Sequence, residues 1–564
     1  MKQTVSAWSL SSWLVATALA MPVVALAWFA WVPESHSWLH LKETVLADYI
    51  SHSLWLSVGV ALGTFLIGVS TAWLTTMYRF PFSRFFQWAL LLPMAMPAYI
   101  IAFTYTGMLD PAGPLQFHLR ELMGWEYGSY WFPSVTHVGG AITMLSLVLY
   151  PYVYLLSRAS FLEQSLCVLD VGRTLGLGPF QRFFRIALPL ARPGIVAGVS
   201  IAVMETLADY GTVKYFGIST FTTGIFRTWF GLDDPAGAAR LSGLLLGFVF
   251  IALTIERYSR SRQRFHHTSQ RHQALTAKPL RGLPATLAAI ACALPLLLGF
   301  IIPISQLGLW AAESWHSIDA HFLTLSWNSL WVAATAAVVA TALAAILVYG
   351  LRLHPQWPQR LAVRSAGLGY AIPGTVIAVG VMIPAGQFDH WLNQHWPTAI
   401  GAAPGLVLSG TFIALIFAYC LRFMAVSLQA LESGMGRIKP NIDEAANSLG
   451  ARRWRILQAL HLPMLRGSLL TALLLVFVDV LKELPATLVM RPFDFNTLAV
   501  RAFELASDER LAEAALPSVA IVLTGLLPVL LLSRSIARSR HGADGKPLHT
   551  TQNATPIPTE LDRL

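Results

Sequence analysis

Twelve apolar stretches, each roughly 20 residues long, set the strongest constraint on how this 564-residue chain can fold. A helix of about this length crosses some 30 Å of hydrocarbon. Hydrophobic residues make up 55% of the chain and charged residues 12%, which excludes an ordinary soluble core. The expected fold class is therefore an all-α polytopic membrane protein. The stretches lie near 11–32, 54–78, 88–109, 136–157, 193–212, 240–256, 284–310, 326–351, 365–384, 405–430, 467–490 and 514–533.

The second half of the chain repeats the first. A shift of 274 residues, or of 276 further upstream, aligns the two halves. The matched positions include Glu444 with Asp170, Gly450 with Gly176, Pro463 with Pro189, Asp479 with Glu205, Glu483 with Asp209 and Ser329 with Ser53. Self-similarity at a fixed period indicates a repeat architecture. We expect two six-helix repeats, at 1–256 and 284–534, with a basic linker at 257–283 and a tail at 535–564.

The distribution of basic residues predicts the orientation in the membrane. Lys and Arg fall on alternate loops, and the loops at 311–325 and 385–403 contain neither. Because loops on the cytoplasmic side carry the excess of basic residues, both termini and the linker are expected to be cytoplasmic. The same rule explains the basic linker more simply than nucleic-acid contact does, so no nucleic-acid partner is expected, only the lipid bilayer.

A polar, arginine-rich segment at 436–463 interrupts the apolar pattern of the second half. The glycine at Gly450 predicts a turn between two short helices, the second of which we expect to end at Pro463. Each arginine would cost a few kcal/mol in hydrocarbon. The segment is therefore expected to be a structured loop outside the membrane.

This segment resembles the EAA loop of bacterial ABC importer permeases, with Glu444-Ala445-Ala446 followed by Gly450 and Pro463. The resemblance implies that the loop docks into a separate ATP-binding subunit. The first half contains a second EAA-like loop at 160–190, which departs from the pattern because Asp170-Val171 replaces Glu-Ala. The coupling positions that the resemblance implies are Asp170, Gly176, Glu444, Ala445 and Gly450.

The apolar helix after each loop carries two carboxylates four residues apart. They are Glu205 with Asp209 in the first copy and Asp479 with Glu483 in the second. Residues at this spacing share one face of a helix. In one interpretation, the acids line the translocation path or its outer gate and transiently contact a hard cation through oxygen ligands, with no stable metal site. In the other, Lys214 and Lys482 neutralise them and the pairs are structural.

The stretches ETLADYGTVKYFGISTFTTGIFRTWF at 205–230 and KELPATLVMRPFDFNTLAVRAFELASDERLAEAALPS at 482–518 resemble the fused permeases of periplasmic ferric iron uptake systems. This resemblance implies a type I importer fold in the bacterial inner membrane, with pseudo-two-fold symmetry between the copies. It also implies two copies of an ATP-binding subunit on one side and a periplasmic ferric-binding protein on the other. The sequence contains no Walker A, nucleophile-elbow or zinc motif, so we expect no enzyme and no cofactor in this chain, with ATP bound by the partner subunit.

Two other interpretations stay open. The same machinery could carry thiamine, sulfate, a polyamine or a phosphonate, and an anionic cargo would favour positive residues or free helix N-termini on its path. A proton-driven secondary transporter can also be built from repeats with intramembrane carboxylates. Such a carrier, however, would have no use for two EAA-like loops.

Overall fold

The computed structural model describes residues 7–29, 36–163, 174, 176–261, 277–397 and 402–541. These residues are almost entirely helical, as expected for segments in hydrocarbon, where a helix satisfies its own backbone hydrogen bonds. Two short strands, β1 (Tyr78–Arg79) and β2 (Lys278–Pro279), pair in parallel. This pairing ties the start of the second half to the first.

The helices of the first half are α1 (Ala7–Phe29), α2 (His36–Thr44), α3 (Leu46–Met77), α4 (Ser83–Ala89), η1 (Leu92–Ala95), α5 (Ala98–Leu109), α6 (Pro114–Met123), α7 (Val138–Glu163), α9 (Pro179–Arg182), η2 (Phe183–Ala187), α10 (Leu188–Ala208), α11 (Gly211–Tyr215), α12 (Phe221–Phe226), η3 (Arg227–Gly231) and α13 (Pro235–Ser261).

The helices of the second half are α14 (Leu283–Leu296), η4 (Leu297–Ile301), α15 (Ile302–Glu313), η5 (Trp315–Ser317), α16 (Ala320–Leu353), α17 (Trp357–Ala366), η6 (Gly367–Ala371), α18 (Gly374–Gln394), α19 (Phe412–Gly436), α20 (Pro440–Ser448), α21 (Arg453–Ile456), η8 (Leu457–His461), α22 (Leu462–Leu481), α23 (Pro485–Met490), α24 (Leu498–Ser507) and α25 (Leu511–His541).

Within the described residues, 10 helical segments are long and apolar enough to cross a membrane, and the number rises to 12 if two bent pairs each count as one span. The spans expected near 88–109 and 365–384 are these bent pairs, with angles of 90° and 115° between their halves. Pro97 and Pro373 stand directly before the second helix of each pair. Because proline lacks an N–H and restricts the residue before it, it ends one helix and starts another.

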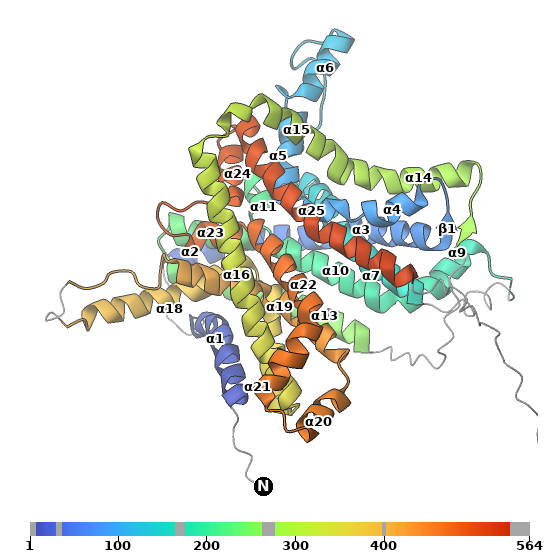
Figure 1. Ribbon diagram of the computed structural model, residues 1–564. Helices are drawn as coiled ribbons and strands as arrows, with labels where there is room; N and C mark the ends of the chain where they lie inside the picture. Colours follow the sequence, from blue (N-terminus) through green and yellow to red (C-terminus); the bar gives the residue numbers. More distant parts are fainter. Residues whose placement is uncertain are drawn as a thin grey trace, which may run out of the picture.

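The body of the molecule consists of two interlocked sets of long helices. The helices α3, α7 and α10 pack together in the first half, as α16, α19 and α22 do in the second (Figure 1). The first helix of each half crosses over, since α1 packs against α16, α17 and α18 while α14 packs against α3 and α4. Both hydrophobic cores accordingly mix the halves: one joins Tyr150 to Phe300, and the other joins Phe221 to Tyr419.

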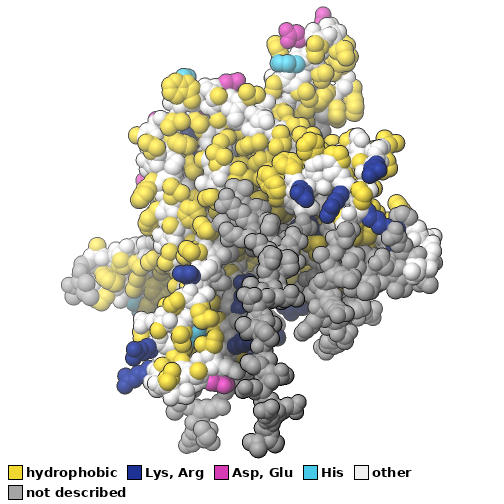
Figure 2. Space-filling model, turned by 45° about the vertical axis from the view of Figure 1, so that its right-hand side comes forward, with side chains coloured by type: hydrophobic (Ala, Val, Ile, Leu, Met, Phe, Trp, Pro, Cys, Tyr) yellow, Lys and Arg dark blue, Asp and Glu magenta, His cyan; other side chains and the backbone are white. Residues whose placement is uncertain are grey.

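Hydrophobic side chains cover much of the outer surface of the described chain (Figure 2). Leu62 and Leu66 on α3 are among those that are more than half exposed. On the face shown, basic side chains lie away from the α6 end, where acidic side chains gather. An apolar surface of this extent fits contact with lipid rather than with water.

Glycine residues allow α7 to approach both of its neighbours closely. A Cβ atom at Gly198 of α10 would lie 2.7 Å from the Cα atom of Val153, and one at Gly68 of α3 would lie 2.7 Å from the Cβ atom of Val153. Small residues at such crossings let membrane helices pack backbone to backbone. The three-helix core of the first half therefore depends on these two positions.

We expect Gly198→Ala to destabilise the protein by about 1–3 kcal/mol, because the added methyl group meets backbone atoms that cannot move aside. The matched control is Gly247→Ala on α13, where a Cβ atom would meet no described atom within 4 Å. The control should be neutral or stabilising by about 0.5–1 kcal/mol, since alanine favours a helix more than glycine does. Thermal unfolding in detergent measures both, and equal melting points would contradict the close packing.

Candidate functional site

A cavity of about 130 Å³ lies between the two halves. Its walls include Tyr99 of α5, Tyr152 of α7, Tyr370 of η6 and Arg422 of α19. It also contains all four of the paired carboxylates, namely Glu205, Asp209, Asp479 and Glu483. Among the described residues, no three His, Cys, Asp or Glu side chains converge as metal ligands. The fold thus brings the four acids together from both copies, while their role in transport stays a prediction.

The second acid of each pair lies beyond the end of the helix that carries the first. The helix α10 ends at Ala208 and α22 ends at Leu481, so the expectation that each pair shares one helix face is wrong. Asp209 Oδ2 accepts the backbone N–H of Val213 at 3.1 Å. Glu483 Oε2 accepts that of Thr487 at 3.0 Å. A carboxylate is favoured at a helix start, where it satisfies free N–H groups, so each acid stabilises the short helix that follows the long one.

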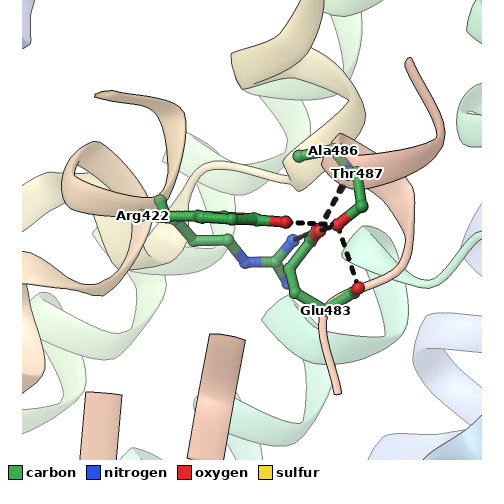
Figure 3. Close-up of polar contacts among 5 residues, drawn as sticks. Arg422, Glu483, Ala486 and Thr487 are labelled. Atoms are coloured by element: carbon green, nitrogen blue, oxygen red, sulfur yellow. Dashed lines mark hydrogen bonds and ion pairs between the residues drawn. The ribbon is translucent and has the colours of Figure 1, made fainter. Parts of the chain in front are cut away.

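Glu483 is fully engaged by its neighbours (Figure 3). The Arg422 Nη1 atom lies 3.1 Å from Glu483 Oε1, and the Thr487 hydroxyl donates to Oε2 at 2.6 Å. The Glu483 side chain is 1% exposed. Gly374 leaves room for it, since a Cβ atom there would lie 2.8 Å from Oε1. Such a carboxylate has little capacity left for a passing ion, so its contacts favour the structural interpretation.

The remaining charges differ between the copies. In the second copy, Lys482 Nζ lies 2.9 Å from Asp479 Oδ1, the neutralising contact expected from the sequence. In the first copy, Lys214 lines a separate cavity together with Arg227, and neither Glu205 nor Asp209 forms an ion pair within the described chain. Four carboxylates and two cations leave the main cavity with an excess of two negative charges (4 − 2). The two acids of the first copy are the ones that form no ion pair, although Lys482 also interacts with Glu205.

Several residues of the cavity were not predicted from the sequence, among them Arg422, Tyr370 and Tyr152. Arg422 carried a usable signal, because an arginine inside the apolar stretch at 405–430 needs a partner. Tyr370 interacts with Glu205 and with Tyr152, so both phenols lie beside the carboxylate that lacks a cation. Packing between distant helices brings the tyrosines there, and no local pattern indicates it.

The described coupling positions form an exposed surface at the turn between α20 and α21. Glu444, Ala445 and Gly450 are all exposed. Gly450 has φ +78° and Gly176 has φ +75°, a left-handed conformation that glycine adopts without strain. Both copies therefore turn at the same aligned glycine. Asp170 lies outside the described residues.

The helix after this turn does not end at Pro463, contrary to the expectation from the sequence. It continues through η8, a π-helical turn, into α22, and 453–481 forms one membrane-length helix. The first copy has the same turn at η2, so a shift of 274 residues superposes 183–187 on 457–461. A π turn ahead of a proline accommodates the missing N–H without breaking the helix.

Asp443, in the first turn of α20, is held by two basic side chains. Its Oδ2 atom lies 2.9 Å from Arg352 Nε and its Oδ1 atom lies 2.8 Å from His461 Nε2. Burial alone would raise the pKa of Asp443, but the hydrogen bonds and charges of His461 and Arg352 outweigh it and hold this pKa below its ordinary value. A lowered pKa means that the contact stabilises the fold at neutral pH and is lost only as the pH falls through that value.

Residues 64–258 match the family described as binding-protein-dependent transport system inner membrane component. This part of the chain is thus similar to the membrane component of binding-protein-dependent transport systems. The fold prediction, an all-α polytopic permease, is therefore confirmed. The structure adds the detail that two of the spans are broken.

Three relatives illustrate the similarity. The permease is 25% identical to the Fe(3+)-transport system permease protein FbpB 2 of Haemophilus influenzae, over 87% of this chain and 90% of that protein. It is 23% identical to the ferric transport system permease protein FbpB of Actinobacillus pleuropneumoniae, over 79% of this chain and 65% of that protein. The molybdenum transport system permease protein ModB of Escherichia coli is 26% identical, over 36% of this chain but 90% of its own length. The last protein thus matches a stretch that is shorter than one repeat of this chain.

We expect Glu483→Ala to destabilise the permease by about 3–5 kcal/mol, because it leaves the Arg422 guanidinium buried and unpaired. The double variant Arg422→Met with Glu483→Met should recover part of this loss, since it removes both charges at similar volume. Thermal unfolding in detergent measures the stability of the wild type, the single variant and the double variant. Glu205→Gln is the control, because Glu205 forms no ion pair among the described residues. Wild-type stability of Glu483→Ala would show that the pair is not structural.

Proposed function

We propose that this permease forms the membrane path for ferric iron in an ABC importer. The observation that carries the proposal is the cavity between the two halves, where four carboxylates meet only two cations. Carboxylate oxygens suit hard cations, and an excess of negative charge favours a cation over an anion. The two relatives named for ferric iron, which match most of the chain, support the same cargo.

The partners follow from the family. ABC import permeases work with an ATP-binding subunit and a periplasmic binding protein, and we propose two copies of the former and a ferric-binding protein as the latter. We further propose the bacterial inner membrane as the location, with both termini in the cytoplasm. The gathering of basic side chains away from α6 supports this orientation (Figure 2). ATP is hydrolysed by the partner, and this chain carries neither the ATPase site nor a cofactor.

The helix that runs from α21 into α22 supports a mechanism. At 1.5 Å per residue, the 29 residues from Arg453 to Leu481 reach roughly 43 Å, from the EAA loop to the cavity. Closure of the ATP-binding subunits moves α20, and the continuous helix carries this movement to Asp479. The two halves then rock between inward and outward access, as packed repeats do in other transporters.

Glu205 is the carboxylate that we assign to the passing cation. It is half-buried in the cavity wall, beside the Tyr370 phenol, and it forms no ion pair within 4 Å among the described residues, although Lys482 lies near enough to interact with it. Asp209 is the second candidate, although Thr212 and Val213 already occupy its two oxygens. The acids of the second copy are neutralised by Arg422 and Lys482.

Uptake of radiolabelled ferric iron tests this proposal. Cells that carry the wild-type permease should accumulate iron in an ATP-dependent way, and Glu205→Gln should lower the initial rate roughly tenfold, as the loss of a contact of about 1.4 kcal/mol would. Glu126→Gln is the matched control, because this glutamate is exposed and lies outside the cavity. The amount of permease in the membrane must be equal in all strains.

Labelled thiamine, sulfate and molybdate serve as parallel cargoes. Uptake of one of them instead of iron would replace the proposed cargo and keep the permease. Normal iron uptake by Glu205→Gln would remove this carboxylate from the path. Iron uptake that survives ATP depletion but collapses with an uncoupler would indicate a proton-driven carrier.

The exposed EAA loop yields a separate prediction. Glu444→Lys reverses a charge on the surface open to the partner, and Gly450→Pro cannot adopt the left-handed φ of the turn. Both variants should insert into the membrane yet lose ATP-driven uptake almost completely. Membrane content by immunoblot and uptake measured side by side separate the two effects. Full uptake by either variant would contradict a coupling role.

A further inference from the structure

Three side chains from three elements meet beside the EAA loop of the second copy. Asp443 of α20 contacts Arg352 at the end of α16 and His461 at the end of η8. The loop helix α20 is thereby joined both to a long helix of the body and to the start of α22. The two contacts use different oxygens of one carboxylate, so neither displaces the other.

The histidine of this cluster is buried, with a side chain that is 1% exposed. The ionised carboxylate of Asp443 can only accept, so the Nε2 atom of His461 carries the hydrogen. The other ring nitrogen, Nδ1, has no hydrogen-bond partner in the described structure, and the ring packs edge-on against Tyr349 at 5.6 Å. His461 therefore makes a single side-chain hydrogen bond, to Asp443, and this contact suits a residue that holds α20 in place.

The same helix of the body also holds the far side of the turn. The Tyr349 hydroxyl donates to the carbonyl oxygen of Arg453 at 2.9 Å, and the Tyr349 ring packs at 4.9 Å against Trp8 of α1. Thus α16 is bonded to the loop both before and after Gly450. A turn held on both sides moves as a unit with α16 and α22.

The first copy lacks these residues. At the aligned positions Arg352 corresponds to Thr76, Asp443 to Leu169 and His461 to Ala187. Tyr349 corresponds to Trp73, which packs against Phe183 at 5.0 Å. An aromatic contact is not directional in the way that a charge-assisted hydrogen bond is. The first copy therefore lacks these three side chains at the aligned positions, although the backbone turn is shared.

We propose that Arg352, Asp443 and His461 are positioning residues that clamp α20 to the membrane helices, so that ATP-driven movement is transmitted mainly through the second copy. The inference rests on the proposed function, because it presumes that an ATPase acts on this loop. A loop that was free to tilt on its own would absorb the movement of the partner. The clamp converts the same movement into displacement of α16 and α22.

The test uses the complete permease–ATPase complex in proteoliposomes, with the loaded binding protein on the outer side. Uptake and ATP hydrolysis are measured on the same vesicles for Asp443→Asn, Arg352→Met and His461→Leu. Uptake per ATP hydrolysed should fall about fivefold or more, the lower range of coupling between linked sites, while the ATPase still copurifies. His461→Gln, which restores a donor near the Nε2 position, should recover most of the coupling.

The matched control is Arg510→Met, which breaks an exposed ion pair with Glu513 far from the loop and should leave the ratio unchanged. A merely structural role would lower assembly, hydrolysis and uptake together and leave uptake per ATP constant, which would overturn the proposal. Amide hydrogen exchange of 440–448 in the purified permease is the arm that needs no cargo. The exchange rate should rise in Asp443→Asn, and an unchanged rate would overturn the clamp. This outcome is independent of the proposed function, which a failure of wild-type uptake would overturn separately.

Discussion

A carboxylate enclosed in an apolar protein must find a cation, hydrogen-bond donors or water, because an unpaired buried charge costs several kcal/mol. The cavity of this permease meets that demand in two ways. Glu483 is saturated by Arg422 and by the start of α23, so it stabilises the second copy. Glu205 forms no ion pair among the described residues and instead contacts the Tyr370 phenol in the cavity wall. Of these two acids, Glu205 is therefore the one with oxygen atoms less occupied by protein contacts.

The duplication preserves the backbone more closely than the charges. Both copies turn at an aligned glycine, pass through a π turn ahead of a proline, and cap a short helix with an acid at the end of the long one. The cations Arg422 and Lys482, by contrast, align with Val148 and Ala208, which cannot pair with an acid. Features that a membrane helix needs in order to end and turn are therefore shared. The residues that set the charge of the cavity are not.

The twelve apolar stretches and the duplication were enough to predict the all-α fold, because periodicity and length express the needs of a helix in hydrocarbon. The bends at Pro97 and Pro373 were not predicted, since composition alone does not distinguish a straight span from a broken one. The sequence indicated the four acids but not their geometry, because the helix ends depend on side-chain caps. Arg422 was within reach of the sequence, whereas the tyrosines around Glu205 depend on contacts between distant helices.

The helix that passes from α21 through η8 into α22 connects the two charged sites of the second copy. Its lower end is fixed by the contact of His461 with Asp443, and its upper end leads to the ion pairs of Asp479 and Glu483. The first copy has Val148, Ala208 and Ala187 where the second has Arg422, Lys482 and His461, and neither Glu205 nor Asp209 forms an ion pair among the described residues. The two copies therefore differ in how they hold their acids: the second places ion pairs on Asp479 and Glu483, whereas the first leaves Glu205 without one among the described residues.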